Sequence, residues 1–191
     1  MDNHFLKTYF NEFKALINDD DEIINDIILA KQFIYNASKK GKKSVIVGNG
    51  GSAAIASHFS VDLTKNAKVR CINFNESDLI TCFSNDYGYE DWVARAIDFY
   101  GDKGDVLIAI SSSGSSKNIL NGCAAAKKKK FSKIITLSGH SSNNPLKAKG
   151  DINLWVDSIA YNHVENIHQL WLLSIVDLII GKSEYPASPI E

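Results

Sequence analysis

The sequence predicts an α/β fold, a three-layer sandwich built on a five-stranded parallel sheet, and three observations lead to it. Five short runs are rich in β-branched residues and too continuously apolar for a sheet with one exposed face. Helical patterns separate these runs along the chain. Two of the strands run directly into small polar residues followed by a helix, as in doubly wound sheets. We therefore expect helices to cover both faces of the sheet.

Two helices are expected before the sheet. Apolar residues recur at helical spacing over 5–17, which predicts a short amphipathic helix. An acidic run at 19–22 suits the positive N-terminal end of a second helix, which continues to Gly41. Residues 1–41 thus form N-terminal helices in front of an α/β core at 42–160.

The core alternates strands and helices, and a last helix follows it. A polar, turn-rich segment at 84–89 interrupts the longest helical pattern. The last helix is apolar on most sides, so it must be buried in the core or between subunits. The expected strands are 44–47, 69–74, 106–110, 134–137 and 152–156, and the expected helices are 52–65, 77–100, 115–130 and the C-terminal helix 161–181, with a loose tail at 182–191.

Composition names no macromolecular partner. The chain of 191 residues has 21 Lys+Arg against 22 Asp+Glu, which suits one globular domain and argues against a nucleic-acid binder. The lysines at 127–130 end a helix, where cations complement the dipole. No apolar stretch reaches the length of a membrane span. Three cysteines without CxxC spacing argue against a disulfide framework or zinc knuckle, so we expect a cytoplasmic, reduced setting.

Two strand ends are followed by residues that indicate a ligand-binding site. The first strand runs into Gly48-Asn49-Gly50-Gly51-Ser52, and the third runs into a segment at 111–116 with five serines among six residues. Ligands of open α/β sheets bind at the carboxyl ends of the strands, where helix N-terminal amides and serine hydroxyls can hold an anion. The pattern favours a phosphate or sugar phosphate bound without a lysine. The alternative is that the glycines only make a tight turn and the serines only cap a helix.

Ionisable side chains on two helices are candidates for acid/base work. His58 and Asp62 are spaced i, i+4 and share one helix face, close to the glycine-rich loop. Glu165 and His168 share a face of the last helix. Sugar isomerisation needs such groups for proton transfer, while His and carboxylates can instead hold a metal. A structural role for the histidines is the remaining alternative.

Four motifs together, GNGGSAAIASHF, SNDYGYED, DVLIAISSSGSSKNI and ITLSGH, resemble the sugar isomerase (SIS) domain family over nearly the whole chain. The resemblance is to members that interconvert sedoheptulose 7-phosphate and a heptose 7-phosphate through an enediol. It implies a five-stranded parallel sheet and a homo-oligomer, a tetramer with sites shared between subunits. By motif, Asn49, Gly50, Gly51 and Ser52 line the substrate, Asn85 and Asp86 contact the sugar, and Ser111, Ser112, Ser113 and Ser116 hold the phosphate.

The chain departs from the family pattern at its catalytic residues. Asp62 stands where the family has glutamate, Glu165 where it has glutamine, and Leu173 where it has a histidine that serves as second acid/base and zinc ligand. Leucine can neither transfer a proton nor bind metal.

Two functions therefore stay open. The first is a phosphosugar isomerase that uses Asp62, Glu165 or His168 for proton transfer, with zinc possible on His58, Asp62 and Glu165. The second is a non-catalytic phosphosugar-binding protein with a regulatory or partner-bridging role.

Overall fold

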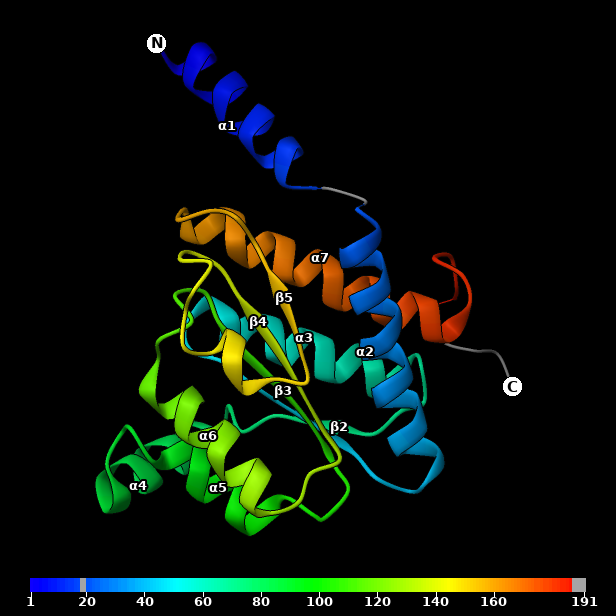
Figure 1. Cartoon of the computed structure of the whole chain (residues 1–191), viewed down its shortest axis with the longest axis vertical. Helices are drawn as coiled ribbons and strands as arrows, with labels where there is room; N and C mark the ends of the chain where they lie inside the picture. Colours follow the sequence, from blue (N-terminus) through cyan, green and yellow to red (C-terminus); the bar gives the residue numbers. More distant parts are fainter. Residues whose placement is uncertain (18–19, 187–191) are drawn as a thin grey trace.

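The sheet is parallel and five-stranded, as the sequence predicts. A computed structural model describes residues 1–17 and 20–186, and within them the chain forms seven α-helices, one 3₁₀ turn and five strands in the order β2-β1-β3-β4-β5 (Figure 1). All neighbouring pairs run parallel. The strands are β1 (Ser44–Val47), β2 (Cys71–Ile72), β3 (Val106–Ser111), β4 (Lys133–Ser138) and β5 (Ile152–Trp155).

Helices cover both faces of this sheet, which explains why its central strands carry no polar alternation. Every residue of β1 and β3 is buried. One hydrophobic cluster lies under α2 (Asp21–Lys39), α3 (Gly51–Lys65) and α7 (Tyr161–Ile180). A second lies under α5 (Trp92–Tyr100) and α6 (Lys117–Lys128), with α4 (Ser77–Tyr87) packed at its edge. The three-layer sandwich is confirmed.

The strand order brings two loops together. β1 and β3 are neighbours in the middle of the sheet, with β2 on one side and β4 on the other. This is the point at which a doubly wound sheet reverses direction, and ligands bind at the carboxyl ends of the strands there. The loop from β1 to α3 and the loop from β3 to α6 both leave from this edge. The fold therefore places the glycine-rich loop beside the serine-rich loop.

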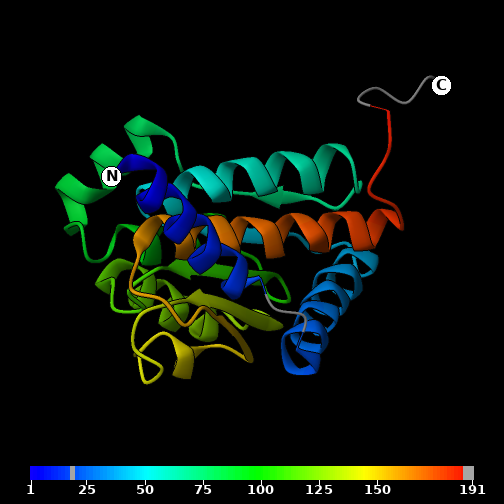
Figure 2. The ribbon, with the colours of Figure 1, turned by 90° about the horizontal axis from the view of Figure 1, so that it is seen from above.

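The last helix, α7, lies in the core beside α3 (Figure 2). Its residues Tyr161–Ile180 match the expected range, and eight of them are buried. Gly181 follows in the left-handed conformation, with φ of 87°, which ends the helix. Within the described residues no helix, α7 included, combines the length and hydropathy of a membrane span. The predicted tail lies partly outside the described residues, which end at 186.

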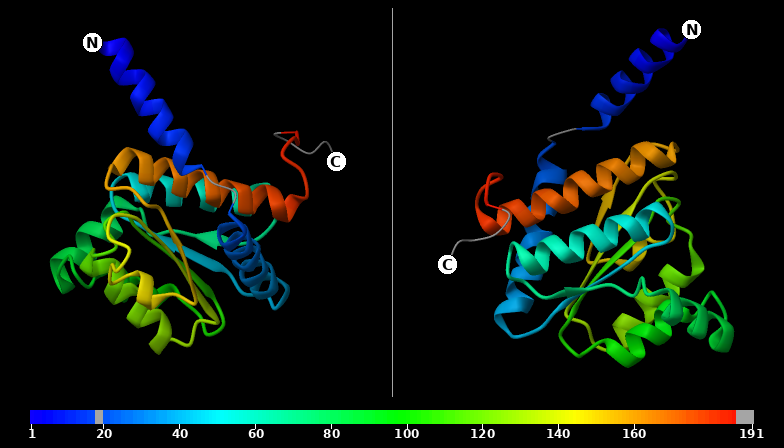
Figure 3. Two further views of the ribbon diagram at one scale, coloured as in Figure 1. Left: turned by 45° about the horizontal axis from the view of Figure 1, so that its top comes forward. Right: turned by 180° about the vertical axis from the view of Figure 1, so that it is seen from behind.

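The first helix, α1 (Asp2–Leu16), forms as expected but projects away from the body of the protein (Figures 1 and 3). All its residues are described, and none of them is buried. It contacts α7 through Tyr9, whose ring centroid lies 4.4 Å from that of His163. Phe5, Leu6 and Phe10 are exposed. This helix therefore has an apolar face that no other part of the described chain covers.

Two predicted elements differ from the structure. The expected strand at 69–74 is reduced to Cys71–Ile72, because Asn75 donates its backbone N–H to Asn73 Oδ1 and the chain turns. The expected helix at 77–100 is two helices. α4 ends at Gly88, which has φ of 84°. The first part of the segment predicted as a turn, residues 84–87, is therefore the last turn of α4.

Candidate functional site

A small cavity of about 130 Å³ opens at the carboxyl edge of β1 and β3. The two predicted loops supply most of its wall, and the start of α7 closes it. The lining residues are Asn49, Ser52, Ile110, Ser111, Ser112, Ser113, Ser116, Tyr161 and Glu165. The structure thus brings together six residues that the sequence assigned to substrate binding, from loops about sixty residues apart in the chain. We call this cavity the serine pocket.

The serine loop, residues 111–116 at the end of β3, is a turn held by backbone hydrogen bonds. Gly114 has φ of 67°, and its N–H donates to the Ser111 carbonyl at 2.8 Å. The Gly114 carbonyl accepts from the Leu146 N–H at 2.9 Å, which ties the loop to the segment after β4. The Ser112 hydroxyl is buried and has no hydrogen-bond partner among the described residues. Buried hydroxyl groups are normally hydrogen-bonded, so a buried hydroxyl without a protein partner in a fixed loop indicates a group that donates to a ligand.

The glycine loop, residues 48–52 where the chain passes from β1 into α3, lets α3 begin close to β1 and α7. A Cβ at Gly51 would collide with the Glu165 carboxyl group, and a Cβ at Gly48 would lie 2.7 Å from the Ser52 backbone. Gly50 has φ of 56°, in the left-handed region. Gly50 and Gly51 do not line the serine pocket themselves. They allow the close approach that brings Ser52 and Glu165 to it.

Two helix N-termini add further donors. α3 begins at Gly51 directly after the glycine loop, and α6 begins at Lys117 directly after Ser116. The first amides of a helix have no intrahelical acceptors and form the positive end of its dipole. Combined with the serine hydroxyls, they suit a phosphate group without a cationic side chain.

Glu165 supplies the only carboxyl group among the described residues of the pocket wall. It lies on the first turns of α7, half-buried, with its carboxyl group against Gly51. Burial raises the pKa of this carboxyl group above its usual range. A carboxyl group with a raised pKa is a stronger base than an ordinary carboxylate, which suits it to acid/base work.

His58 and Asp62 form a pair, but away from this pocket. His58 Nε2 lies 3.3 Å from Asp62 Oδ2, and Gln169 Nε2 lies 3.3 Å from His58 Nδ1. Asp62 is ten residues beyond Ser52 on α3, which at 1.5 Å per residue is roughly 15 Å along the helix. The i, i+4 pairing is as expected. Within one chain, however, Asp62 does not reach the serine pocket.

Two other candidates also lie away from the pocket. Asn85 and Asp86 are exposed on the last turn of α4, where Asn85 Nδ2 donates to Asp86 Oδ1 at 2.9 Å. Neither lines the serine pocket. Leu173 is half-buried, two turns of α7 beyond Glu165, and offers no acid/base group there.

His168 is a core residue in this fold. Its side chain is fully buried, and Nε2 lies 3.1 Å from the Ser138 carbonyl oxygen. Burial lowers the pKa of His168 to about 4, partly offset by that hydrogen bond, so the imidazole is neutral at neutral pH. The prediction that His168 transfers protons to a substrate gains no support, because His168 does not line the serine pocket.

We expect His168 to make stability depend on pH. The unfolded chain binds a proton at pKa about 6.5 and the folded chain only at about 4, so stability falls as pH drops through that window. His168→Phe should flatten this part of the curve. Urea unfolding between pH 7 and 4 measures it. Equal slopes in both proteins would contradict a buried, neutral His168.

The zinc hypothesis finds no site within one chain. Among the described residues, no group of three or more His, Cys, Asp or Glu side chains is close enough to hold a metal ion. Both ring nitrogens of His58 already face protein groups, Gln169 on one side and Asp62 on the other. His58, Asp62 and Glu165 therefore do not form the expected ligand set here.

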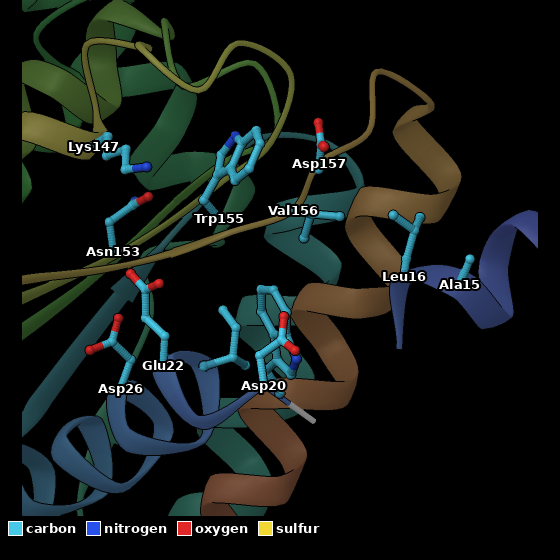
Figure 4. A pocket seen from close by; sticks show the side chains of 12 residues that line it. Ala15, Leu16, Asp20, Glu22, Asp26, Lys147, Asn153, Trp155, Val156 and Asp157 are labelled. Carbon is cyan, nitrogen blue, oxygen red and sulfur yellow. The ribbon is translucent and has the colours of Figure 1, made fainter. Parts of the chain in front are cut away.

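A larger cavity lies elsewhere and has the wrong chemistry for a phosphate. It measures about 490 Å³ and lies between the start of α2 and β5. Asp20, Glu22 and Asp26 reach toward it from one side, and Lys147 and Trp155 from the other (Figure 4). Burial and the charge of Glu22 raise the pKa of Asp26. This acidic cavity repels anions, so the smaller serine pocket is the phosphate candidate.

Sequence reasoning missed four residues of the site. Ile110 is the residue before the end of β3, and Tyr161 lies one helical turn before Glu165 on α7. Asn118 and Tyr89 hydrogen-bond to Asn49. Tyr161 was detectable from its i, i+4 spacing to Glu165. The partners of Asn49 were not, because they lie 40 and 69 residues away in the sequence.

The fold and the serine pocket define a protein class that comparison with known families makes explicit. The family model described as "SIS domain" matches residues 8–139, more than half of the chain. The chain therefore belongs to the SIS domain family.

Within that family the chain is similar to phosphoheptose isomerases. It is 35% identical over 190 residues to the phosphoheptose isomerase of Buchnera aphidicola subsp. Acyrthosiphon pisum, covering 93% of this chain and 97% of the relative. It is 36% identical over 159 residues to that of Cytophaga hutchinsonii, covering 78% and 83%.

Solved structures agree with this grouping. A phosphoheptose isomerase from Francisella tularensis aligns with a TM-score of 0.85 and 27% identity, over 95% of this chain and all of that one. The fold also matches phosphoheptose isomerase from Neisseria gonorrhoeae, with a TM-score of 0.88, 24% identity and the same coverage.

Proposed function

We propose that this chain is a phosphosugar aldose-ketose isomerase that interconverts sedoheptulose 7-phosphate and D-glycero-D-manno-heptose 7-phosphate. The observation that carries the proposal is Glu165, a carboxyl group of raised pKa in the wall of a pocket built for a phosphate group. The names of the relatives supply a phosphoheptose, and the resemblance to the family supplies sedoheptulose 7-phosphate as the ketose. The serine loop holds the phosphate, and this fixes the other end of the open-chain sugar near Glu165.

The reaction then moves one proton between neighbouring carbons. The Glu165 carboxylate removes a proton from C1 of the ketose, the C1–C2 double bond forms, and the carbonyl oxygen at C2 takes up a proton. The resulting enediol receives a proton at C2 and loses the proton of the C1 hydroxyl, which gives the aldose. Glu165 is suited to remove the carbon proton because burial raises its pKa and so makes its carboxylate a stronger base.

Asp62 supplies the second acid/base in this proposal, from a neighbouring subunit. The outer face of α3 and α7 carries exposed Val61 and Leu170 beside the His58–Asp62 pair. α1 adds the exposed residues Phe5, Leu6 and Phe10. Apolar surface on three helices supports a homo-oligomer, with a tetramer as the expected form. Asn85 and Asp86, exposed on α4, would contact the sugar across a subunit interface.

The expected setting is the cytoplasm. All three cysteines, Cys71, Cys82 and Cys123, are free, and burial raises the pKa of the Cys123 thiol to about 12, so that this thiol is unreactive. Free thiols of this kind suit a reducing compartment.

A second candidate function rests on Leu173. If the missing family histidine has removed catalysis, the serine pocket remains, and the protein binds a phosphosugar to regulate or bridge partners. This alternative predicts ligand binding without turnover.

One experiment separates the two functions. We expect sedoheptulose 7-phosphate to raise the melting temperature, because a ligand of the native state stabilises it by RT ln(1 + [L]/Kd). We also expect its conversion to the heptose, with uptake of solvent deuterium at the carbon that receives the proton. Binding without conversion or exchange would favour the regulatory alternative. No melting shift with any six- or seven-carbon sugar phosphate, or with inorganic phosphate, would overturn the phosphate site itself.

A further inference from the structure

Two asparagines join the walls of the serine pocket by a reciprocal pair of hydrogen bonds. Asn49 Nδ2 donates to Asn118 Oδ1 at 3.0 Å, and Asn118 Nδ2 donates to Asn49 Oδ1 at 2.8 Å. Tyr89 donates its hydroxyl proton to the same Asn49 oxygen at 3.2 Å. Asn118 lies in the first turn of α6 and is only 2% exposed. We call these three side chains the amide clamp.

The clamp leaves Asn49 a single unused hydrogen-bonding function. A carboxamide has two N–H donors and an oxygen with two lone pairs. Both lone pairs of Asn49 Oδ1 are taken, by Asn118 and Tyr89, and one N–H is given to Asn118. Among the described residues the second N–H has no acceptor, and Asn49 lines the serine pocket. Toward a ligand, Asn49 can therefore act only as a donor.

The position of Asn49 indicates which part of a ligand accepts a hydrogen bond from its free N–H. Asn49 belongs to the glycine loop, next to Ser52, whereas the serine loop at 111–116 carries the hydroxyls suited to the phosphate. An oxygen of the sugar is therefore the acceptor. A donor fixed beside the carbonyl end of the sugar also stabilises the negative charge that develops on its oxygen during proton transfer.

We propose that Asn118 is a positioning residue, which, together with Tyr89, holds the Asn49 carboxamide so that its free N–H is offered to a sugar oxygen. The proposal deepens the proposed function and rests on it for the identity of the ligand. Asn118 itself touches no substrate, since it does not line the serine pocket.

Other contacts hold the segment that follows Tyr89 against α6. Lys117 Nζ lies 2.7 Å from Glu90 Oε1. Asn121 Nδ2 donates to the Glu90 carbonyl at 3.0 Å and to Asp91 Oδ1 at 2.9 Å. These bonds tie the segment before α5 to α6 without Asn118. They also make Asn121 a matched control, an asparagine of the same helix with two long-range hydrogen bonds outside the pocket.

The test is a double-mutant cycle of Asn49→Ala and Asn118→Leu, with affinities for sedoheptulose 7-phosphate and inorganic phosphate measured by calorimetry. We expect each single variant to weaken sugar phosphate binding about 10-fold, the value of one hydrogen bond. The double variant should be no weaker than Asn49→Ala alone, because both remove the same contact. Inorganic phosphate should bind all of them within about 3-fold of wild type, since it needs only the serine loop.

Several outcomes would overturn the proposal. One is a loss of sugar phosphate affinity in the double variant that equals the product of the two single-variant losses. Another is an equal loss for sugar phosphate and inorganic phosphate in Asn118→Leu, which indicates a merely structural role. A third is a loss in Asn121→Leu as large as that in Asn118→Leu.

A second variant protects the test against misfolding. Asn118→Asp keeps the size of the side chain and its acceptor but loses the donor to Asn49 Oδ1. We expect weak sugar phosphate binding at pH 7.5 and recovery relative to wild type as the pH falls, because the protonated acid can donate again. A constant ratio to wild type across pH would contradict the clamp.

A ligand-free measurement separates this proposal from the proposed function. If wild type binds neither sugar phosphate nor inorganic phosphate, the proposed function fails. The urea unfolding free energies of the same cycle then decide on the clamp. Non-additive losses uphold the Asn49–Asn118 coupling, and additive losses overturn it.

Discussion

Replacing Gly114 by alanine is expected to abolish phosphate binding and to destabilise the protein. Gly114 has φ of 67°, and the left-handed conformation costs an L-residue about 1–2 kcal/mol. An added Cβ would also collide with the carboxamide of Asn144. Asn144 cannot move away easily, because it is buried and donates to Ser138 Oγ at 3.0 Å and to the Ser141 carbonyl at 2.8 Å. Overpacking of this kind adds about 1–3 kcal/mol.

The loss should appear in two measurements. Urea unfolding gives the fall in stability, and calorimetric titration gives the affinity for inorganic phosphate, which should drop below detection as the serine loop shifts. Gly41→Ala is the control, since Gly41 has φ of 72° but open space around its Cβ position. It should show the conformational cost alone and normal phosphate binding. Wild-type affinity in Gly114→Ala would show that phosphate binds elsewhere.

The parts of the fold and site that were predicted well from the sequence are those set by residues close together in the chain. Ser52 and Ser111 follow directly from the rule that ligands bind where strands end, because β1 and β3 are short, buried and adjacent. α7 was predicted over its whole length because its apolar residues recur at helical spacing from Val164 to Ile180. Local pattern is sufficient for such elements.

The parts that failed depend on distances that no local pattern contains. His168 shares a helix face with Glu165 in the sequence, yet residues three apart on an α-helix differ in direction by about 60°. That difference puts His168 against Ser138 in the core instead of in the pocket. Asp62 has the expected partner in His58, but the length of α3 carries it away from the serine pocket. The role proposed for Asp62 therefore depends on assembly of subunits, which one chain's sequence does not describe.

Replacing Glu165 by glutamine is expected to slow isomerisation by about 100- to 10,000-fold, the usual contribution of a positioned acid/base. Glutamine keeps the size and the contact with Gly51 but cannot move a proton. Phosphosugar affinity should be unchanged or tighter, because the substitution removes a negative charge from a pocket that binds a negatively charged ligand. Isomerisation rate and solvent deuterium uptake give the first result, and calorimetry the second. Turnover at the wild-type rate would exclude Glu165 as the base.

The same variant, Glu165→Gln, should also change how the stability of the protein depends on pH. The folded protein holds a proton on Glu165 at higher pH than the unfolded chain does, since burial raises the pKa. Stability from this group is therefore complete below the unfolded pKa and falls as pH rises through the folded one. Glu165→Gln removes that fall, so its melting temperature should exceed that of wild type at pH 7 and match it near pH 4.

Mixing two inactive proteins tests whether Asp62 completes the site from a neighbour. We expect Asp62→Asn to abolish solvent deuterium exchange, as Glu165→Gln does. If each site combines Glu165 of one subunit with Asp62 of another, mixed oligomers contain some sites with both native residues and recover part of the activity. Unfolding and refolding the two variants together forms such oligomers, and refolding each alone is the control. Mixtures that stay inactive, although mass spectrometry shows that subunits have mixed, would mean that Asp62 acts within its own chain or not at all.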